Sequence, residues 1–168
     1  MNFASLFSSL KRLPLGAKIL AVTMTLTVMS FFAQSALSPK ASAEESAAVA
    51  GFLSGLLSTE TAFGRFVIDN IRKIGHFLEY GLLGVQSVLF ALLYVERKNM
   101  IKYLFFSSLS SLVIALFDET TQIFSGRGSS ITDVWIDFFG YVTLSLISLG
   151  VLCLCIRIVK IFKEKRNG

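Results

Sequence analysis

The sequence lacks the short motifs that most often assign a function directly. It contains no glycine-rich phosphate loop, no C-x-x-C pair, no G-x-S-x-G, and neither an internal repeat nor a low-complexity tract. Its only two cysteines, Cys153 and Cys155, lie two residues apart in the last apolar run, where a helix points their side chains away from each other. The cysteines therefore indicate neither a disulfide nor a metal-binding pair.

Charged residues are also scarce, at 16%, while 54% of the residues are hydrophobic and 16 are Phe. With a mean hydropathy of +0.69, the chain is too apolar for a soluble domain of 168 residues. Apolar runs of about 20 residues match the length of helix that crosses a bilayer. The sequence therefore predicts an all-α membrane protein, a single domain over residues 1–168 built as a bundle of four transmembrane helices. The predicted ranges are 15–37, 75–94, 103–123 and 134–156.

The first apolar run has two interpretations. Ala41-Ser42-Ala43 before Glu44 resembles the A-x-A cleavage site of a signal peptide. The run is longer than the apolar core of a usual signal peptide, so we favour a retained first span. Residues 38–61 then change to Ser, Ala, Glu and Gly, and apolar residues recur at helical spacing within them and again from Phe63 to Ile74. These two stripes predict short helices lying in the membrane interface, in the first extracytoplasmic segment, the second leading into the next span.

The net charge of +5 does not indicate a nucleic-acid partner, because the basic residues cluster just beyond the ends of the apolar runs. Placing both termini in the cytoplasm leaves only five of the 16 basic residues outside. These five are Lys40, Arg65, Arg72, Lys73 and Arg127. The excess of positive charge inside predicts a multi-pass protein of the cell membrane with both termini cytoplasmic, and the lipid bilayer as its obligatory partner.

The stretch 117–140 places six polar or charged side chains between two apolar runs, where uncompensated charge is costly. They are Asp118, Glu119, Gln122, Arg127, Asp133 and Asp137. Helical periodicity brings Asp118 and Gln122 onto one face with Glu119 at its edge, and stacks Asp133 and Asp137 on another. An S-x-x-D capping box would explain Ser130 and Asp133 as a helix start, but not the other carboxylates.

A second polar stretch begins the second span and holds the only histidine. Lys73, His76, Tyr80, Gly84 and Ser87 fall on one helix face. A single histidine at a membrane edge is more often a packing residue. Its position on a face shared with a lysine, a tyrosine and small residues favours a functional role, because polar side chains in a bundle face its interior.

The predicted topology puts both stretches at the outer face, where they could form one pocket. The candidate catalytic residues are His76, Asp118, Glu119 and Asp137, and the candidate substrate-binding residues are Lys73, Tyr80, Gln122, Arg127 and Asp133. Carboxylates with a histidine could hold a divalent metal or act as general acid and base, and cations could bind a phosphate. The spacing matches no dedicated metal motif. A self-neutralising ion-pair network that fixes helix register is the structural alternative.

At these residues the sequence resembles the VanZ-like family of small bacterial membrane proteins. The pattern is K-x-x-H-F-x-E-Y from Lys73 to Tyr80, then D-E-x-x-Q-x-F-x-x-R and D-x-x-x-D-x-x-G between Asp118 and Gly140. The chain departs from the family pattern at Ser125, where a proline is frequent, and at Leu144, where a second glycine often follows. The resemblance implies a polytopic membrane protein, and the named member is associated with low-level resistance to teicoplanin.

These observations favour an outward-facing site that binds or acts on an envelope lipid or a lipid-linked cell-wall precursor, with an influence on glycopeptide susceptibility. A non-catalytic accessory protein, whose polar cluster only holds the bundle together, is the second interpretation. A proton or ion pathway is the third, and it is less favoured because only Ser and Thr continue toward the inner side. Neither catalysis, the substrate nor the oligomeric state follows from the sequence.

Overall fold

The computed structural model describes residues 14–167, and the basic residues Lys11 and Arg12 that entered the topology count lie outside them. Six helices and no strands are found in this part of the chain. They are α2 (Leu15–Ser35), α3 (Pro39–Ser54), α4 (Ala62–Asp69), α5 (Ile71–Tyr94), α6 (Arg97–Phe124) and α7 (Ile131–Asn167). Four of them, α2, α5, α6 and α7, are long and apolar enough to cross a membrane, which confirms the predicted all-α, four-span architecture.

Three of the spanning helices, α5, α6 and α7, are longer than the apolar runs alone predict, whereas α2 ends at Ser35, two residues before the predicted end. Helix α5 begins at Ile71 rather than at residue 75, and α6 begins at Arg97, so that only Val95 and Glu96 separate the two helices. The polar residues 97–102 contain no proline or glycine to stop a helix, which explains the extension. The first turn of α5 thereby gains Arg72 and Lys73.

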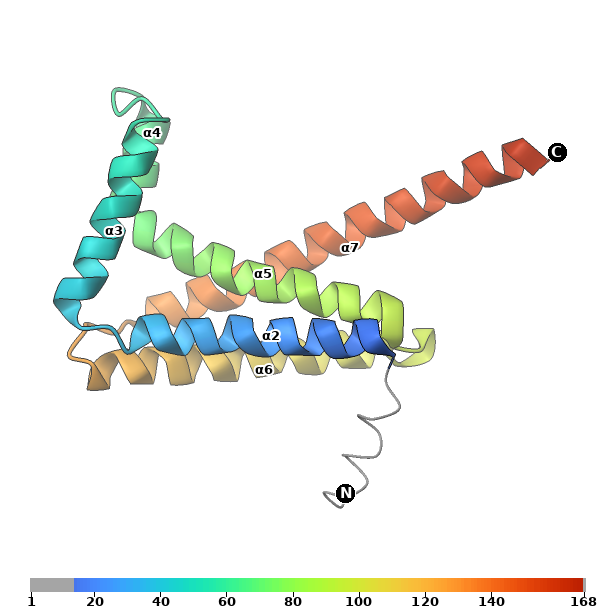
Figure 1. Ribbon diagram of the computed structural model, residues 1–168, viewed down its shortest axis with the longest axis horizontal. Coiled ribbons are helices and arrows are strands. Elements are labelled where there is room, and N and C mark those ends of the chain that lie inside the picture. Colours follow the sequence, from blue (N-terminus) through green and yellow to red (C-terminus); the bar gives the residue numbers. More distant parts are fainter. Residues whose placement is uncertain (1–13, 168) are drawn as a thin grey trace, which may run out of the picture.

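Helix α7 is the longest element, with 37 residues. At 1.5 Å per residue it measures about 55 Å, well beyond the roughly 30 Å of a bilayer core. Its C-terminal part extends past the other helices (Figure 1). Lys165 and Arg166 lie in its last turn, where positive charge is favourable next to the helix dipole.

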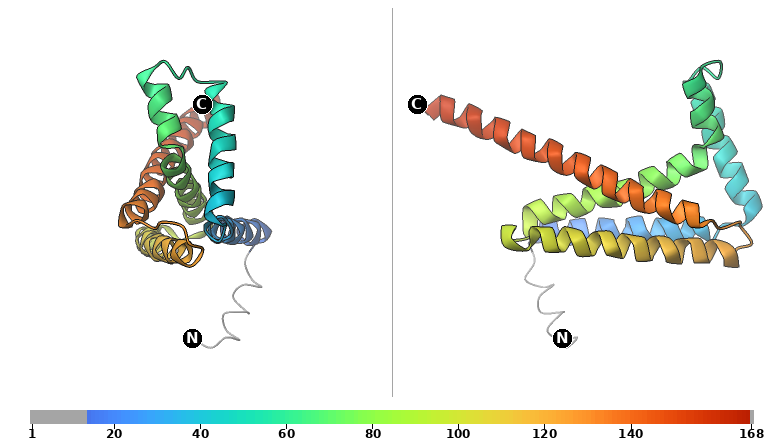
Figure 2. Two further views of the ribbon diagram at one scale, coloured as in Figure 1. Left: turned by 90° about the vertical axis from the view of Figure 1, so that its left-hand side faces the viewer. Right: turned by 180° about the vertical axis from the view of Figure 1, so that it is seen from behind.

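Helices α3 and α4 occupy the segment that was predicted to hold short interfacial helices. Ser38 caps α3 by accepting a hydrogen bond from Ala41 N–H, with Pro39 at the first helical position, and Thr61 caps α4 in the same way through Gly64 N–H. Helix α3 rises steeply from one end of α2, and α4 runs back next to it toward the start of α5, as Figures 1 and 2 show. Their direction across the end of the bundle agrees with a position along a membrane face.

The closest packing in the molecule joins α5 to α7, which cross each other (Figures 1 and 2). Gly84 lies against the carbonyl oxygen of Tyr141 and the hydroxyl of Ser145, and Gly140 lies against the backbone of Phe77. A side chain at either position would collide with these atoms, so the glycines permit the close approach. This contact fixes the register of the two helix starts, on which His76 and Asp137 lie.

The core of the bundle is small, as expected where lipid covers most apolar side chains. Phe31, Tyr80, Leu83, Ala115, Val134 and Tyr141 form it. The rings of Phe31 and Tyr80 stack with centroids 4.6 Å apart, and Tyr141 Oη donates a hydrogen bond to Ser107 Oγ at 2.8 Å. These contacts bring α2 and α5, and α6 and α7, together beside the polar end of the bundle.

Candidate functional site

The polar stretches of the sequence meet at one end of the bundle, where α2 and α6 end and α5 and α7 begin. The face of α6 that periodicity predicts to be polar is the buried face of that helix, with Asp118 at 1%, Glu119 at 4% and Gln122 at 0% exposure. Asp137 on α7 is also fully buried. Buried charge of this density inside an apolar bundle has to be compensated by partners, and the partners divide the residues into two groups.

The first group consists of Glu119 and the residues joined to it by hydrogen bonds, and we call it the Glu119 network. Its other members are Arg72, Gln122 and Ser130. Glu119 Oε1 accepts a hydrogen bond from Gln122 Nε2 at 2.7 Å, and Oε2 accepts one from Ser130 N–H at 2.9 Å. Arg72 on α5 donates to Gln122 Oε1. The network therefore ties the start of α5 to the end of α6 and the start of α7.

The start of α7 shows why Glu119 is needed there. Ser130 Oγ accepts a hydrogen bond from Thr132 N–H at 3.1 Å, as an N-cap does. In a capping box, the acidic side chain three residues on would accept from Ser130 N–H. Here that donor goes to Glu119 instead of Asp133, so the carboxylate of the box comes from another helix. Asp133 is half-buried in the first turn of α7, where its charge is favourable next to the helix dipole.

The turn after α6 positions Arg127. Gly126 has a positive φ of 75°, Gly126 N–H donates to Ile123 O, and Arg127 N–H donates to Gln122 O. This is a Schellman motif, in which the left-handed residue is normally glycine. Arg127 Nη1 then donates to Gln34 O at the end of α2, 2.7 Å away. The guanidinium thus adds a second donor to a carbonyl at the end of α2, which also accepts from Leu37 N–H, while lying beside the pocket described below.

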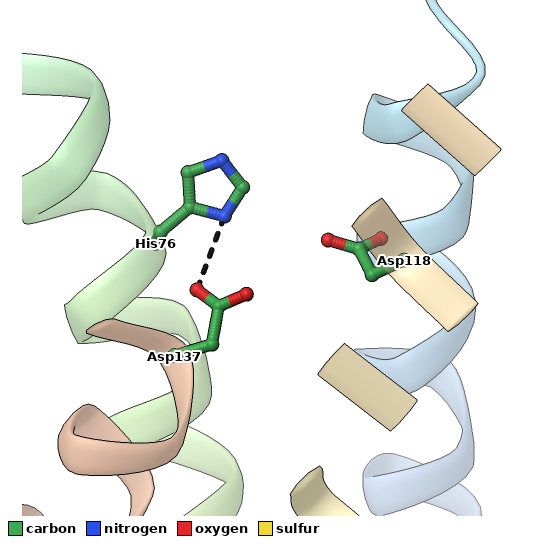
Figure 3. Close-up of side chains that lie close together, drawn as sticks. All are labelled: His76, Asp118 and Asp137. Carbon is green, nitrogen blue, oxygen red and sulfur yellow. Dashed lines mark ion pairs between the residues drawn. The ribbon is translucent and has the colours of Figure 1, made fainter. Parts of the chain in front are cut away.

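The second group consists of His76, Asp118 and Asp137, which come from three different helices and which we call the His76 cluster (Figure 3). His76 Nδ1 lies 3.3 Å from Asp137 Oδ1, yet neither atom forms a hydrogen bond. Asp137 Oδ2 has no hydrogen-bond partner either. Asp118 Oδ1 accepts a hydrogen bond from Ser35 Oγ at 2.7 Å. One atom from each of the three side chains can be chosen so that all lie within 4.8 Å of one another.

A pocket of about 270 Å³ opens beside this cluster. Its charged or ionisable lining residues are Glu45, Arg72, His76, Glu79, Asp118 and Arg127. Helix α3 forms one wall, to which Val49 and Leu53 contribute apolar surface, and Phe31 and Leu78 add more from α2 and α5. Charged and apolar side chains therefore lie next to each other in the lining of the pocket, on the bundle side as well as on α3.

Two cations of the pocket are not neutralised by ion pairs. Among residues 14–167, neither Arg72 nor Arg127 forms a salt bridge with a carboxylate, and the Nε atoms of both are buried without a hydrogen-bond partner. Burial lowers the pKa of the Arg127 guanidinium, and the nearby positive charge of Arg72 lowers that pKa further. Both guanidiniums would be stabilised by an anion.

A family model described as VanZ/LLP1 matches residues 17–155, which is most of the chain. The chain belongs to the VanZ/LLP1 family. No curated protein matches it, and no solved structure does. The family therefore supports a membrane protein, while any statement about its ligand has to come from the site itself.

The structure explains both departures of this chain from the VanZ/LLP1 pattern. Ser125, where a proline is frequent, donates a hydrogen bond to Ser35 O at 2.9 Å and to Gln122 O at 3.0 Å, and so joins the ends of α2 and α6. Leu144, where a glycine is frequent, packs its side chain directly over Gly81 of α5. The bulk that Leu144 adds on one helix is accommodated by the missing side chain on the other.

The predicted site residues occupy three kinds of position. His76, Asp118 and Arg127 line the pocket, and Asp137 lies against His76. Glu119, Gln122 and Tyr80 are buried behind it, the first two within the Glu119 network and Tyr80 stacked on Phe31 with its hydroxyl unpartnered. Lys73 is exposed and Asp133 half-buried, and neither lines the pocket.

Sequence reasoning missed Arg72, Ser35 and Glu45 as parts of the site. Arg72 precedes Lys73 and was counted only among the five basic residues on the outer side. Ser35 looks like any small residue of an apolar span, and Glu45 lies in a segment predicted to be interfacial. The one available signal was the residue type at position 72, because an arginine is better suited than a lysine to partly buried hydrogen bonds and phosphate contacts.

Proposed function

We propose that this VanZ/LLP1 protein binds the phosphate-bearing head of an envelope lipid or of a lipid-linked cell-wall precursor in the pocket between α3 and the bundle. The observation that carries the proposal is the pair Arg72 and Arg127, whose buried Nε atoms have no partner and whose charges have no salt bridge among the described residues. Arginine forks are the side chains best suited to hold phosphate oxygens.

The lining of the pocket supports a lipid rather than a small soluble anion. Val49 and Leu53 of α3, with Phe31 and Leu78, offer apolar surface next to the two guanidiniums. A molecule with an anionic head and an apolar chain would contact both surfaces together. The position at the end of the spanning helices matches the depth of lipid head groups.

The orientation and the cellular role are part of the same proposal. The excess of Lys and Arg at the opposite end of the spans supports cytoplasmic termini in the cell membrane, which places the pocket at the outer leaflet. A protein that binds a cell-wall precursor there would change the amount of precursor accessible to teicoplanin. This is the consequence that we propose for glycopeptide susceptibility.

Lipid binding by the purified protein in detergent tests the proposal. The probe is a short polyprenyl phosphate, with the corresponding polyprenol as the matched ligand without phosphate, and native mass spectrometry measures the bound fraction. We expect the phosphate to bind at least about tenfold more tightly than the alcohol, a difference of about 1.4 kcal/mol. Arg127→Gln should remove most of that difference, because the guanidinium is lost.

Arg65→Gln is the control, since Arg65 is an exposed arginine of α4 outside the pocket. It should bind both probes as the unchanged protein does. Equal binding of phosphate and alcohol by the unchanged protein would overturn the proposal. A loss of binding in Arg127→Gln that only follows a loss of folded protein would favour the accessory interpretation, in which the charges hold the bundle together.

A further inference from the structure

The His76 cluster contains a buried carboxylate whose hydrogen-bonding capacity is unused. Asp137 is 0% exposed, and neither of its oxygens has a hydrogen-bond partner. Burying a carboxylate is unfavourable unless hydrogen bonds or a positive charge compensate it. Glu119, on a neighbouring helix, avoids this cost with two donors. Asp137 is therefore the anomalous acid of this end of the bundle, and its surroundings show what would compensate it.

The groups that face Asp137 are an imidazole at ion-pair distance and a second carboxylate, both of which are metal-ligand types. His76 Nδ1 approaches Oδ1 to 3.3 Å without forming a hydrogen bond, and the Asp118 carboxylate points toward the same space from α6 (Figure 3). An imidazole nitrogen and two carboxylate oxygens converge from three helices to within 4.8 Å of one another. A cation held between them would satisfy all three side chains.

The charges around the pocket agree with a divalent cation. Its lining residues together with Asp137 include four carboxylates, those of Glu45, Glu79, Asp118 and Asp137. Two guanidiniums, Arg72 and Arg127, oppose them. The excess of negative charge is two when all four acids are ionised, which one divalent ion offsets.

We propose that His76, Asp118 and Asp137 form a binding site for a divalent transition metal, with Zn²⁺ and Mn²⁺ as the matching ions. An imidazole nitrogen favours these ions over Mg²⁺ and Ca²⁺, and the carboxylates favour them over ions that need thiolates. Such ions bind oxygen and nitrogen at about 2.0–2.2 Å, so neighbouring ligand atoms of a tetrahedral or octahedral site are about 3–3.5 Å apart. From within 4.8 Å of one another, the three ligand atoms would each have to move by less than about 1 Å, and Asp137 has no hydrogen bond to break in doing so.

The surroundings have the support that metal ligands need. Ser35 Oγ donates to Asp118 Oδ1 and so fixes that carboxylate, in the way that outer hydrogen bonds orient metal ligands. The glycine contacts between α5 and α7 hold His76 and Asp137 in register. Three protein ligands leave coordination positions open, and because His76 and Asp118 line the pocket, those positions face it. This deepens the proposed function: a lipid phosphate held by the two arginines would be within the same pocket as the ion.

Metal binding is measured without lipid, so that it can fail or succeed separately from phosphate binding. The full chain is purified in detergent, freed of metal with a chelator, and titrated with Zn²⁺ against a fluorescent chelator and with Mn²⁺ by electron paramagnetic resonance. We expect one ion per chain and a thermal midpoint that rises with metal concentration, because the ion binds only the assembled helices. Asp137→Asn and His76→Gln should each weaken binding at least tenfold.

Asp69→Asn is the matched control, because Asp69 is an exposed aspartate just before α5 and lies outside the cluster. It should bind metal as the unchanged chain does. The proposal is overturned if the unchanged chain shows no saturable binding, or if Asp137→Asn binds as tightly as Asp69→Asn. If the unchanged chain binds polyprenyl phosphate in the presence of chelator but does not bind metal, only the metal site is refuted. If the chain binds metal but binds polyprenyl phosphate and polyprenol equally well, only the lipid proposal is refuted.

A second variant keeps the test decisive if Asp137→Asn does not accumulate. His76→Cys, made in a chain with Cys153→Ser and Cys155→Ser, replaces the imidazole by a thiolate. Binding should then shift from Mn²⁺ to Cd²⁺, with a sulfur-to-cadmium charge-transfer band in the ultraviolet. A folded His76→Cys chain without that band would overturn the assignment of His76 as a ligand.

Discussion

Glu119 and Asp137 are both buried carboxylates at the same end of the bundle, and they have opposite surroundings. Both oxygens of Glu119 accept hydrogen bonds, from Gln122 and from Ser130, whereas both oxygens of Asp137 lack a partner. A carboxylate whose acceptors are all used within the protein has little left for a ligand. A carboxylate without donors is costly to the protein alone and available to a cation. The difference separates a structural acid from a ligand-binding acid.

The largest expected effect comes from Gly140→Leu, which would disrupt the close contact between α5 and α7. Both the Glu119 network and the His76 cluster include residues at the starts of these two helices. A side chain at Gly140 would collide with the backbone of Phe77. We expect a loss of stability of about 3 kcal/mol, at the upper end for overpacking because backbone atoms cannot rotate away. The measurement is the thermal midpoint in detergent, with the yield of monodisperse protein. Gly150→Leu on the same helix is the control, since nothing lies near that glycine, and an equal loss there would refute the packing argument.

Glu119→Gln tests the structural side of the comparison. The amide keeps the shape, but it turns a donor toward either Gln122 Nε2 or Ser130 N–H and leaves a buried group unpaired. We expect a loss of about 2 kcal/mol, seen as a lower thermal midpoint, and no specific loss of metal affinity in the protein that remains folded. Glu44→Gln serves for comparison, because Glu44 is exposed and makes only a surface pair with Lys40 at 3.9 Å. If Glu119→Gln keeps its stability but no longer binds metal, Glu119 is a ligand-binding acid and not a structural one.

Ser35→Ala tests whether Asp118 is a metal ligand, as Asp137 is proposed to be. It removes the hydroxyl that donates to Asp118 Oδ1, at a cost of about 1 kcal/mol in stability. We expect metal affinity to fall about tenfold, the lower range for losing an outer hydrogen bond to a ligand. Ser30→Ala is the matched change on α2, because the Ser30 hydroxyl is exposed and donates only to Thr27 O. Equal metal affinity in the two variants would show that Ser35 does not position a ligand.

Asp137→Asn should have the smallest effect on stability, and it distinguishes Asp137 from Glu119 most directly. No hydrogen bond to Asp137 is lost, but the variant loses the 3.3 Å ion pair with His76 and at the same time removes a buried charge. Because these two effects oppose each other, we expect the stability of the metal-free protein to change by no more than about 0.5 kcal/mol, with a thermal midpoint that stays nearly the same. The stabilisation by added Zn²⁺ should disappear at the same time. A metal-free Asp137→Asn chain as destabilised as Glu119→Gln would mean that the pair with His76 is a structural ion pair.

Much of this arrangement can be predicted from the residues in order. The four apolar runs specify spanning helices by length and composition, because a bilayer leaves no other way to satisfy the backbone of such segments. Helical periodicity also identifies the buried face of α6, on which Asp118 and Gln122 lie. Side-chain direction within one helix follows from 100° per residue and needs no knowledge of the neighbours.

The prediction is less successful at the first turn of α5. Periodicity groups Lys73 with His76, yet Lys73 is exposed and Arg72 reaches Gln122 and lines the pocket. Near a helix end, the face that meets other elements depends on where those elements lie, here the end of α6. The wall formed by α3 was missed for the same reason, since its direction follows from the turn at Ser35–Ser38 and not from its own composition.

The sequence by itself determined the membrane class, the four spans and the concentration of acids at one end of the bundle, because these depend on length, composition and local periodicity. Only the tertiary structure decided what each acid does. Glu119 and Asp137 are alike as buried acids of a membrane helix, but one lies within reach of Ser130 N–H and the other lies beside His76 and Asp118. Donors and ligands for a buried carboxylate come from other helices, and their distances exist only once the chain has folded.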